Sequence, residues 1–139
     1  MTRSQSIAVT TVFGLALALV RTAWADPASD ACAALFSARI ALYSMINAKD
    51  KSALDPLNEK MKAASTKLDS VLAGMTGADA KRAVDFKTVW DEFKATRDTE
   101  IIPAVYKGNA KDARKIYDGI QLQRLSKMWS IMSCKRGAG

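Results

Sequence analysis

Three arginines in this sequence are candidates for chemistry, because each falls among apolar residues of an expected helix. Arg39 lies between Phe36 and Tyr43, while Arg97 and Arg124 take comparable positions further along the chain. A guanidinium group presents a fork of N–H donors that matches a carboxylate. The three side chains are therefore candidate contacts for a small anionic ligand. The structural alternative is that each aliphatic stem packs in the core while the charged head reaches water or an acid.

The 139 residues include no histidine, which removes the commonest general base and the commonest metal ligand. The Cys-x-x-Cys-His motif of covalently bound haem is absent for the same reason. The methionines are scattered over core positions, as expected for packing rather than for metal capture. We therefore expect no catalytic residue, no metal site and no cofactor.

Four amphipathic segments must position the three arginines. Apolar residues recur at spacings of three and four over residues 27–48, 55–75, 78–107 and 110–134, which is typical of helices that bury one face. Short links between long helices imply antiparallel neighbours. The sequence thus predicts one all-α domain over residues 26–139, an antiparallel up-down-up-down four-helix bundle.

Local signals mark where these helices begin and end. Asp55, placed before a proline, is an expected start of the second helix. Thr76 and Asn109 each have an acid three residues later, so both are expected N-caps. Gly108 is expected to end the third helix in the left-handed conformation that glycine tolerates.

Two further expectations concern the last two helices. Pro103 lies inside the third helix, where it lacks an N–H donor and collides with the carbonyl group four residues earlier. A kink or frayed turn is therefore expected near Thr99. In the fourth helix, Ile120 continues the apolar stripe and is expected to face the core.

The two cysteines lie in the first turns of the first helix and the last turn of the fourth, as Cys32 and Cys134. In an up-down-up-down bundle these two ends meet at the same pole. An intrachain disulfide is predicted if the compartment is oxidising. Two free thiols and a bridge between subunits remain as alternatives.

The first 25 residues have the pattern of an export signal. A short basic start precedes an apolar run too short to span a bilayer comfortably, and Ala23-Trp24-Ala25 supplies small residues for cleavage. We predict a cleaved signal peptide over residues 1–25 and a periplasmic location. An uncleaved membrane anchor is the alternative.

The charge balance is moderately basic, with 21 basic and 14 acidic residues and a formal charge of +7. Residues 1–25 contain Arg3, Arg21 and no acid, so the remainder carries 19 basic and 14 acidic residues, or +5. This excess mildly favours anionic small molecules or surfaces. No basic stripe or aromatic platform indicates nucleic acid as a partner.

The stretch from Trp90 to Cys134 carries a spaced pattern that covers about a third of the chain: Trp90, Phe93, Arg97-Asp98, Ile101, Pro103-Ala104, Gly108, Ala113 and Gly119. The pattern resembles the last two helices of the periplasmic four-helix-bundle sensor domains of bacterial chemoreceptors, the methyl-accepting chemotaxis proteins, and of sensor kinases. The resemblance implies a sensor-like domain, here stand-alone, with ligands held between helices. It also implies a structural role for the Arg97-Asp98 pair.

The leading functional hypothesis is a non-enzymatic periplasmic module that captures a small anionic organic molecule or reports it to a membrane-bound receptor. The main alternative is a structural or stress-related interaction protein without a small ligand, either as a monomer or as a homodimer. A remote alternative is an exported chorismate mutase, since Arg39, Lys49, Asp55 and Glu59 faintly resemble the charged positions of that family. Asn58 stands where that family has an arginine.

Arg39 is the strongest single candidate for an anion contact. Burying a guanidinium group without a partner is costly, so an acid is expected nearby. Asp30 and Asp50 lie too far along the first helix to reach it. The partner must come from another helix, a second subunit or a ligand, and Asp98 and Glu100 are the expected internal acids.

Overall fold

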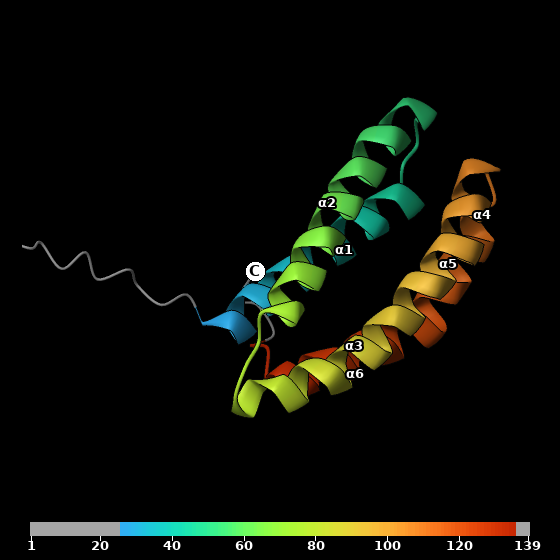
Figure 1. Ribbon diagram of the computed structural model, residues 1–139. Coiled ribbons are helices and arrows are strands. Elements are labelled where there is room, and N and C mark those ends of the chain that lie inside the picture. The colour runs from blue at the N-terminus through green and yellow to red at the C-terminus, as the bar shows by residue number, and fades with distance from the viewer. Residues whose placement is uncertain (1–25, 136–139) are drawn as a thin grey trace, which may run out of the picture.

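Residues 26–135 are described by a computed structural model, in which they form helices joined by short turns (Figure 1). The elements in chain order are α1 (Pro27–Ile46), the 3₁₀ turn η1 (Lys51–Ala53), α2 (Leu54–Ala73), α3 (Ala78–Thr96), the π-helical turn η2 (Arg97–Ile101), α4 (Ile102–Tyr106), α5 (Ala110–Ile116), the π-helical turn η3 (Tyr117–Gln121) and α6 (Leu122–Met132). The predicted antiparallel four-helix bundle is confirmed, with α3–η2–α4 as its third helix and α5–η3–α6 as its fourth. The expected signal peptide lies outside the described residues. Within residues 26–135 no helix has the length and apolarity needed to cross a membrane.

The first two helices form the most closely packed pair, seen side by side in Figure 1. Small side chains line the buried face of α1 and allow the axis of α2 to come close. These are Ala28, Ala31, Ala34, Ala38 and Ala41. The third and fourth helices run beside each other as the second hairpin, with α3 next to α6 and α4 next to α5.

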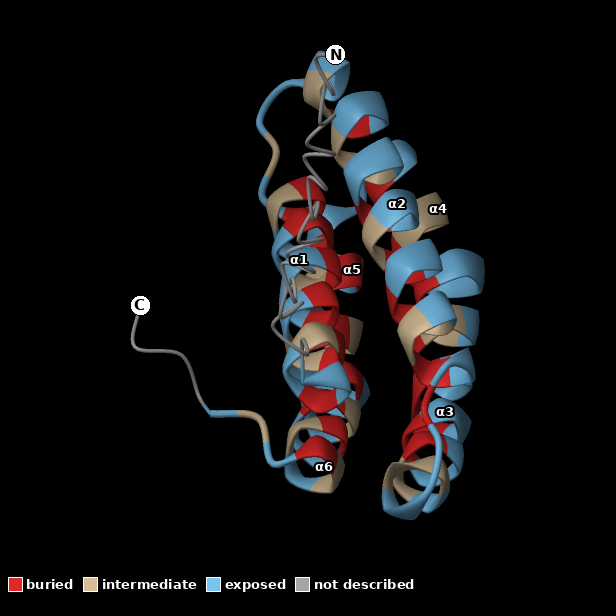
Figure 2. Ribbon diagram, turned by 60° about the vertical axis from the view of Figure 1, so that its left-hand side comes forward, coloured by how far each residue is buried: buried red, intermediate tan, exposed pale blue. Residues whose placement is uncertain are grey.

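The core lies between the two hairpins, where the buried faces of all four helices turn inward (Figure 2). Its centre is aromatic. Trp90 is fully buried and its ring stacks on Phe93, with ring centroids 5.4 Å apart. The indole Nε1 of Trp90 donates a hydrogen bond of 2.8 Å to Asp69 on α2. A large apolar ring is thus buried with its one polar atom satisfied.

The disruption expected near Thr99 takes the form of the π-helical turn η2. The N–H of Ile102 bonds to the carbonyl of Arg97, five residues earlier, instead of the usual four. Pro103 follows directly and has no N–H to donate, so a wider turn accommodates its ring without a break in the helix. The third helix bends between α3 and α4, as Figure 1 shows.

A second π-helical turn, η3, interrupts the fourth helix beside the first. Gly119 inside it has a non-helical backbone, with φ −89° and ψ −106°. The extra residue in this turn shifts the buried stripe, so that Gln121 is fully buried while Ile120 is 43% exposed. The prediction that Ile120 faces the core is therefore wrong, because a uniform helical period does not continue through a π turn.

The turn between the third and fourth helices follows the sequence in part. Gly108 has φ +83° and ends α4 in the left-handed region, as predicted. Asn109 takes the N-cap position of α5, but its side chain makes no capping bond. Its backbone carbonyl instead accepts from the N–H groups of Asp112 and Ala113.

Two predicted helix starts are wrong. Gly77, with φ +60°, occupies the N-cap position of α3 in place of Thr76, whose side chain makes no capping bond. The second helix begins at Leu54, directly after the 3₁₀ turn that Asp50 caps. Asp55 is free of a capping role and accepts a 2.6 Å hydrogen bond from the hydroxyl of Tyr106, which ties α2 to the end of α4.

The structure pairs Cys32 with Cys134, the predicted intrachain bridge, with the two Cα atoms 5.7 Å apart. The bond joins the second turn of α1 to the second residue after the end of α6. It closes a loop with a sequence separation of 102 residues. The first and last helices of the bundle are therefore covalently joined at one pole.

Replacing Pro103 by alanine is expected to change the free energy of unfolding by only about 1 kcal/mol. Alanine restores an N–H group close to the carbonyl of Thr99, and it releases the fixed φ of proline. Urea denaturation followed by circular dichroism measures the difference. A loss of several kcal/mol would contradict this expectation, and would show that proline itself maintains the bend that seats α4 against α5.

Candidate functional site

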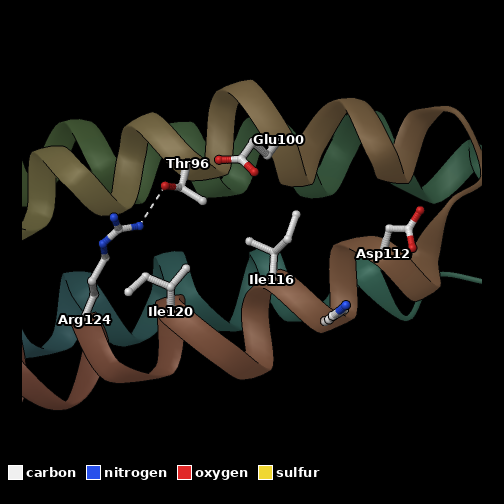
Figure 3. Close-up of a pocket in the computed structure, with 7 residues that line it drawn as sticks. Thr96, Glu100, Asp112, Ile116, Ile120 and Arg124 are labelled. Carbon is white, nitrogen blue, oxygen red and sulfur yellow. Dashed lines mark hydrogen bonds between the residues drawn. The ribbon is translucent and has the colours of Figure 1, made fainter.

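A cleft with a volume of about 480 Å³ lies between the third and fourth helices. Figure 3 shows its two walls, with Thr96 and Glu100 on one and Ile116, Ile120 and Arg124 on the other. Asp112 lies at the end of the cleft remote from Arg124 (Figure 3), and Lys115, also on α5, completes the lining. One candidate from the sequence, Arg124, thus contributes to a concave site between helices.

The two π-helical turns create this site. Glu100 belongs to η2 and Ile120 to η3, so the two irregular turns face each other across the cleft. The register shift in η3 turns Ile120 away from the core and toward the cleft. Single π turns inside α-helices are frequent at functional sites, because they redirect side chains that a regular helix would bury.

The guanidinium group of Arg124 is held in a fixed orientation. Its Nη1 donates to the hydroxyl of Thr96 at 2.7 Å and to Oε1 of Gln121 at 3.0 Å. The amide of Gln121 is itself fully buried, and its Nε2 donates to the carbonyl of Phe93 at 2.9 Å. A cation oriented in this way loses little side-chain entropy when it binds an anion.

The charge of Arg124 is only weakly neutralised within the described residues. Its Nε lies 3.5 Å from Oε2 of Glu92, which is an ionic contact but not a hydrogen bond, and this Nε is buried without a hydrogen-bond partner. The Glu92 side chain is 58% exposed, so solvent screens the pair. The second terminal nitrogen, Nη2, makes no hydrogen bond within residues 26–135 and can donate to a ligand.

The other charged groups of the cleft have no ionic partner within the described residues. In the part of the chain that the structure describes, Glu100, Asp112 and Lys115 form no ion pair within 4.0 Å. With Arg124 the lining contains two cations and two anions. Two isoleucines lie between the charges. The cleft can therefore hold a small molecule that has an apolar part and polar groups of more than one kind.

Arg97 lies outside the cleft, in the core at the start of η2. It is 4% exposed, and its Nε and Nη2 donate to the Asp98 carboxylate at 2.7 and 3.1 Å. Its Nη1 donates to the hydroxyl of Ser65 on α2 at 2.7 Å, and its guanidinium carbon lies 5.8 Å from the Trp90 ring centroid. These contacts hold the bent helix against α2 and leave no open face for a ligand.

Arg39 is partly buried between α1 and the fourth helix and does not belong to the cleft lining. Its Nε donates to the Tyr117 hydroxyl at 3.0 Å, and its guanidinium carbon lies 5.2 Å from the Trp129 ring centroid. The expected pairing with Asp98 or Glu100 is wrong, since no carboxylate lies within 4.0 Å of Arg39 in the described residues and the partners are aromatic. Burial raises the pKa of Tyr117, and the nearby Arg39 opposes that shift.

The three arginines are therefore in three separate places, and most of the cleft lining was missed by the sequence analysis. The spacing of the lining residues in the sequence does indicate that they share helix faces. Thr96 and Glu100 are four residues apart, and so are Asp112, Ile116, Ile120 and Arg124 in succession. Residues four apart share one helix face, so each wall of the cleft corresponds to one such row.

Comparison of the chain with protein-family models, with curated proteins and with solved structures found no match. The resemblance to chemoreceptor sensor domains therefore stays a prediction from the sequence. No group of three or more metal-binding side chains occurs within residues 26–135.

Proposed function

We propose that this protein is a non-enzymatic binding module that captures a small organic carboxylate in the cleft between its third and fourth helices. The observation that carries the proposal is the state of Arg124. Its guanidinium group is held by Thr96 and Gln121 at one end of the cleft, and its Nη2 has no hydrogen-bond partner within the described residues. A carboxylate placed there accepts charge-assisted hydrogen bonds, which are stronger than neutral ones.

The rest of the lining narrows the chemistry of the ligand. In the far part of the cleft, the two acids Glu100 and Asp112 outweigh the single charge of Lys115, so a second carboxylate is disfavoured there. Groups that donate hydrogen bonds, such as hydroxyl or amino groups, suit these two acids. Ile116 and Ile120 can cover a short apolar segment. The ligand that fits best is a monocarboxylate with a donor group at its other end.

The cellular setting in this proposal comes from the sequence. The signal-like segment over residues 1–25 supports a periplasmic module, and the resemblance of the last two helices supports a sensor-like role in which the bound state is reported to a membrane-bound receptor. The disulfide between Cys32 and Cys134 is in keeping with an oxidising compartment.

The second candidate function is an interaction protein without a small ligand. The observation that favours it is a row of exposed apolar side chains on α1, namely Phe36, Ile40 and Tyr43. An enzyme of the chorismate mutase type has less support, because its candidate residues contact different partners. Asp55 bonds to Tyr106 and Glu59 pairs with Lys62, while Arg39 contacts Tyr117.

Arg124→Gln is expected to abolish stabilisation by the ligand. We expect hydroxy- and amino-monocarboxylates to raise the melting temperature of the wild-type protein more than dicarboxylates do. A ligand at a hundred times its Kd stabilises the fold by about 2.7 kcal/mol, which a thermal melt detects. Glutamine keeps a polar contact with Thr96 but removes the charge and the donor fork, so the shift should disappear.

Lys81→Gln is the matched control, because it removes the same charge from an exposed position on α3 that is not part of the cleft lining. This variant should keep the full ligand-induced shift. If no carboxylate at millimolar concentration stabilises the wild-type protein, the interaction protein becomes the better hypothesis. A shift that survives Arg124→Gln would place the binding site elsewhere.

A further inference from the structure

A second group of charged and aromatic side chains lies along the seam between α1 and the fourth helix, a surface referred to as the groove. Phe36, Arg39 and Tyr43 have helical spacing on α1, so they follow one another along one side of it. Across the groove, Tyr117 of η3 and Trp129 of α6 contact Arg39. One guanidinium group is thus placed among aromatic rings at the surface of the bundle.

The contacts of Arg39 leave one edge of its guanidinium group open. Its Nε donates to the Tyr117 hydroxyl, and its guanidinium carbon lies over the Trp129 ring. Nη1 and Nη2 make no hydrogen bond or ion pair within the described residues. Neither nitrogen is fully buried. Both nitrogens therefore reach solvent, and together they present two parallel N–H groups, the geometry that binds a carboxylate through both oxygens.

A second cation adds to the positive potential of this groove. The guanidinium carbon of Arg114 lies 4.6 Å from the ring centroid of Tyr43, and its Nη2 bonds to Oδ1 of Asn47. The nearest carboxylate in the described residues, Asp118, is 4.0 Å from Arg114 and is 54% exposed. The positive charge of the nearby Arg114 also lowers the pKa of Tyr43. The groove therefore carries two guanidinium groups and one acid, and that acid is exposed to solvent, which screens its pairing with Arg114.

The surface beside Arg39 is apolar and aromatic. Phe36 is 46% exposed, Ile40 is 47% exposed and Tyr43 is 43% exposed, although all three are large hydrophobic residues. Between Ala31 and Ile46, α1 has no charged residue except Arg39. A flat apolar group can therefore lie against this row while its charged end meets the open edge of the guanidinium group.

We propose that this groove is a second binding site, for a planar aromatic carboxylate. The carboxylate accepts hydrogen bonds from Nη1 and Nη2 of Arg39, and the aromatic ring packs on the exposed faces of Phe36 and Tyr43. Arg114 contributes long-range attraction. The proposal is independent of the cleft at Arg124, since none of the residues involved lines that cleft.

Benzoate is the probe, and indole N–H signals in nitrogen-15 NMR spectra of the oxidised protein are the readout. Trp129 lies in the groove, whereas Trp90 is buried in the core and serves as an internal reference. We expect a saturable shift of the Trp129 signal at millimolar benzoate and no shift for Trp90. Benzamide lacks the charge and acetate lacks the ring, so each should bind about tenfold more weakly or worse.

Arg39→Gln and Arg39→Lys should both weaken benzoate binding by about tenfold or more, because neither side chain keeps the two-pronged donor. Circular dichroism checks that each variant is folded. Arg124→Gln should bind benzoate in this groove as the wild type does, which separates this site from the cleft.

The proposal is overturned if Trp129 shows no saturable shift, if benzamide binds as well as benzoate, or if the folded Arg39→Lys and Arg39→Gln variants bind normally. It is also overturned if light scattering shows that the wild type is a stable dimer and that the Ile40→Lys variant is a monomer, because the exposed row would then be a protein interface.

Discussion

Replacing Cys32 and Cys134 together by serine is expected to lower the free energy of unfolding by roughly 4–5 kcal/mol. The bridge spans 102 residues of sequence, so it strongly restricts the unfolded chain. Urea denaturation of the variant and of the oxidised wild type gives the difference. This loss is a large part of the stability expected for a domain of this size. The variant should therefore melt well below the wild type.

Reduction of the wild-type protein is the matched comparison. A reductant should bring its urea midpoint close to that of the double serine variant, and the same reductant should leave the variant unchanged. If the variant loses less than about 1 kcal/mol, the unfolded chain must already be compact enough that closing the loop adds little.

The second large effect is expected from Trp90→Ala, which should cost roughly 3–5 kcal/mol. The indole ring is fully buried, stacks on Phe93 and lies under the charged groups of Lys94 and Arg97. Alanine leaves a cavity at the centre of the bundle and removes the hydrogen bond to Asp69. Chemical denaturation followed by far-ultraviolet circular dichroism measures the loss.

Trp129→Ala is the control for Trp90→Ala, since Trp129 is only partly buried at the edge of the bundle. It should cost clearly less than the central substitution. Equal losses for the two variants would contradict the picture of a core centred on Trp90, and would indicate that the contact between Trp129 and Arg39 is a major stabilising feature.

The fold could be predicted from the sequence because its causes are local and repeated. The spacing of apolar residues determines four helices, and their short connections allow one simple arrangement. That arrangement places the helix ends that carry Cys32 and Cys134 at one pole, which predicts the disulfide. Helix starts were less predictable, because Thr76 and Asp55 have the right side chains for capping while the backbone begins each helix at a neighbouring residue.

The π-helical turns could not be predicted in the same way. Pro103 indicated a disturbance, but proline permits a kink, a frayed turn or a π turn, and the choice depends on packing against the neighbouring helix. Nothing comparable marks η3 apart from Gly119. For this reason the sequence predicts that Ile120 faces the core and gives no indication of the cleft that it lines.

The three arginines show why charge alone does not identify a site. Arg97, Arg39 and Arg124 all lie among apolar residues in the sequence, yet the first is enclosed by Asp98 and Ser65, the second meets aromatic rings and the third lines a cleft. Their partners come from distant parts of the chain. Such partners become known only when the packing of all four helices is known.

The bridge at the pole of the bundle also determines how the molecule responds to force and to cutting. A pull applied between residues 26 and 135 passes along a few residues and through the Cys32–Cys134 bond, so the bundle itself carries almost no load. A protease cut in the turn at Gly108 leaves both fragments joined as one covalent molecule. The helices between the cysteines are in effect a closed ring, shielded from tension at its ends.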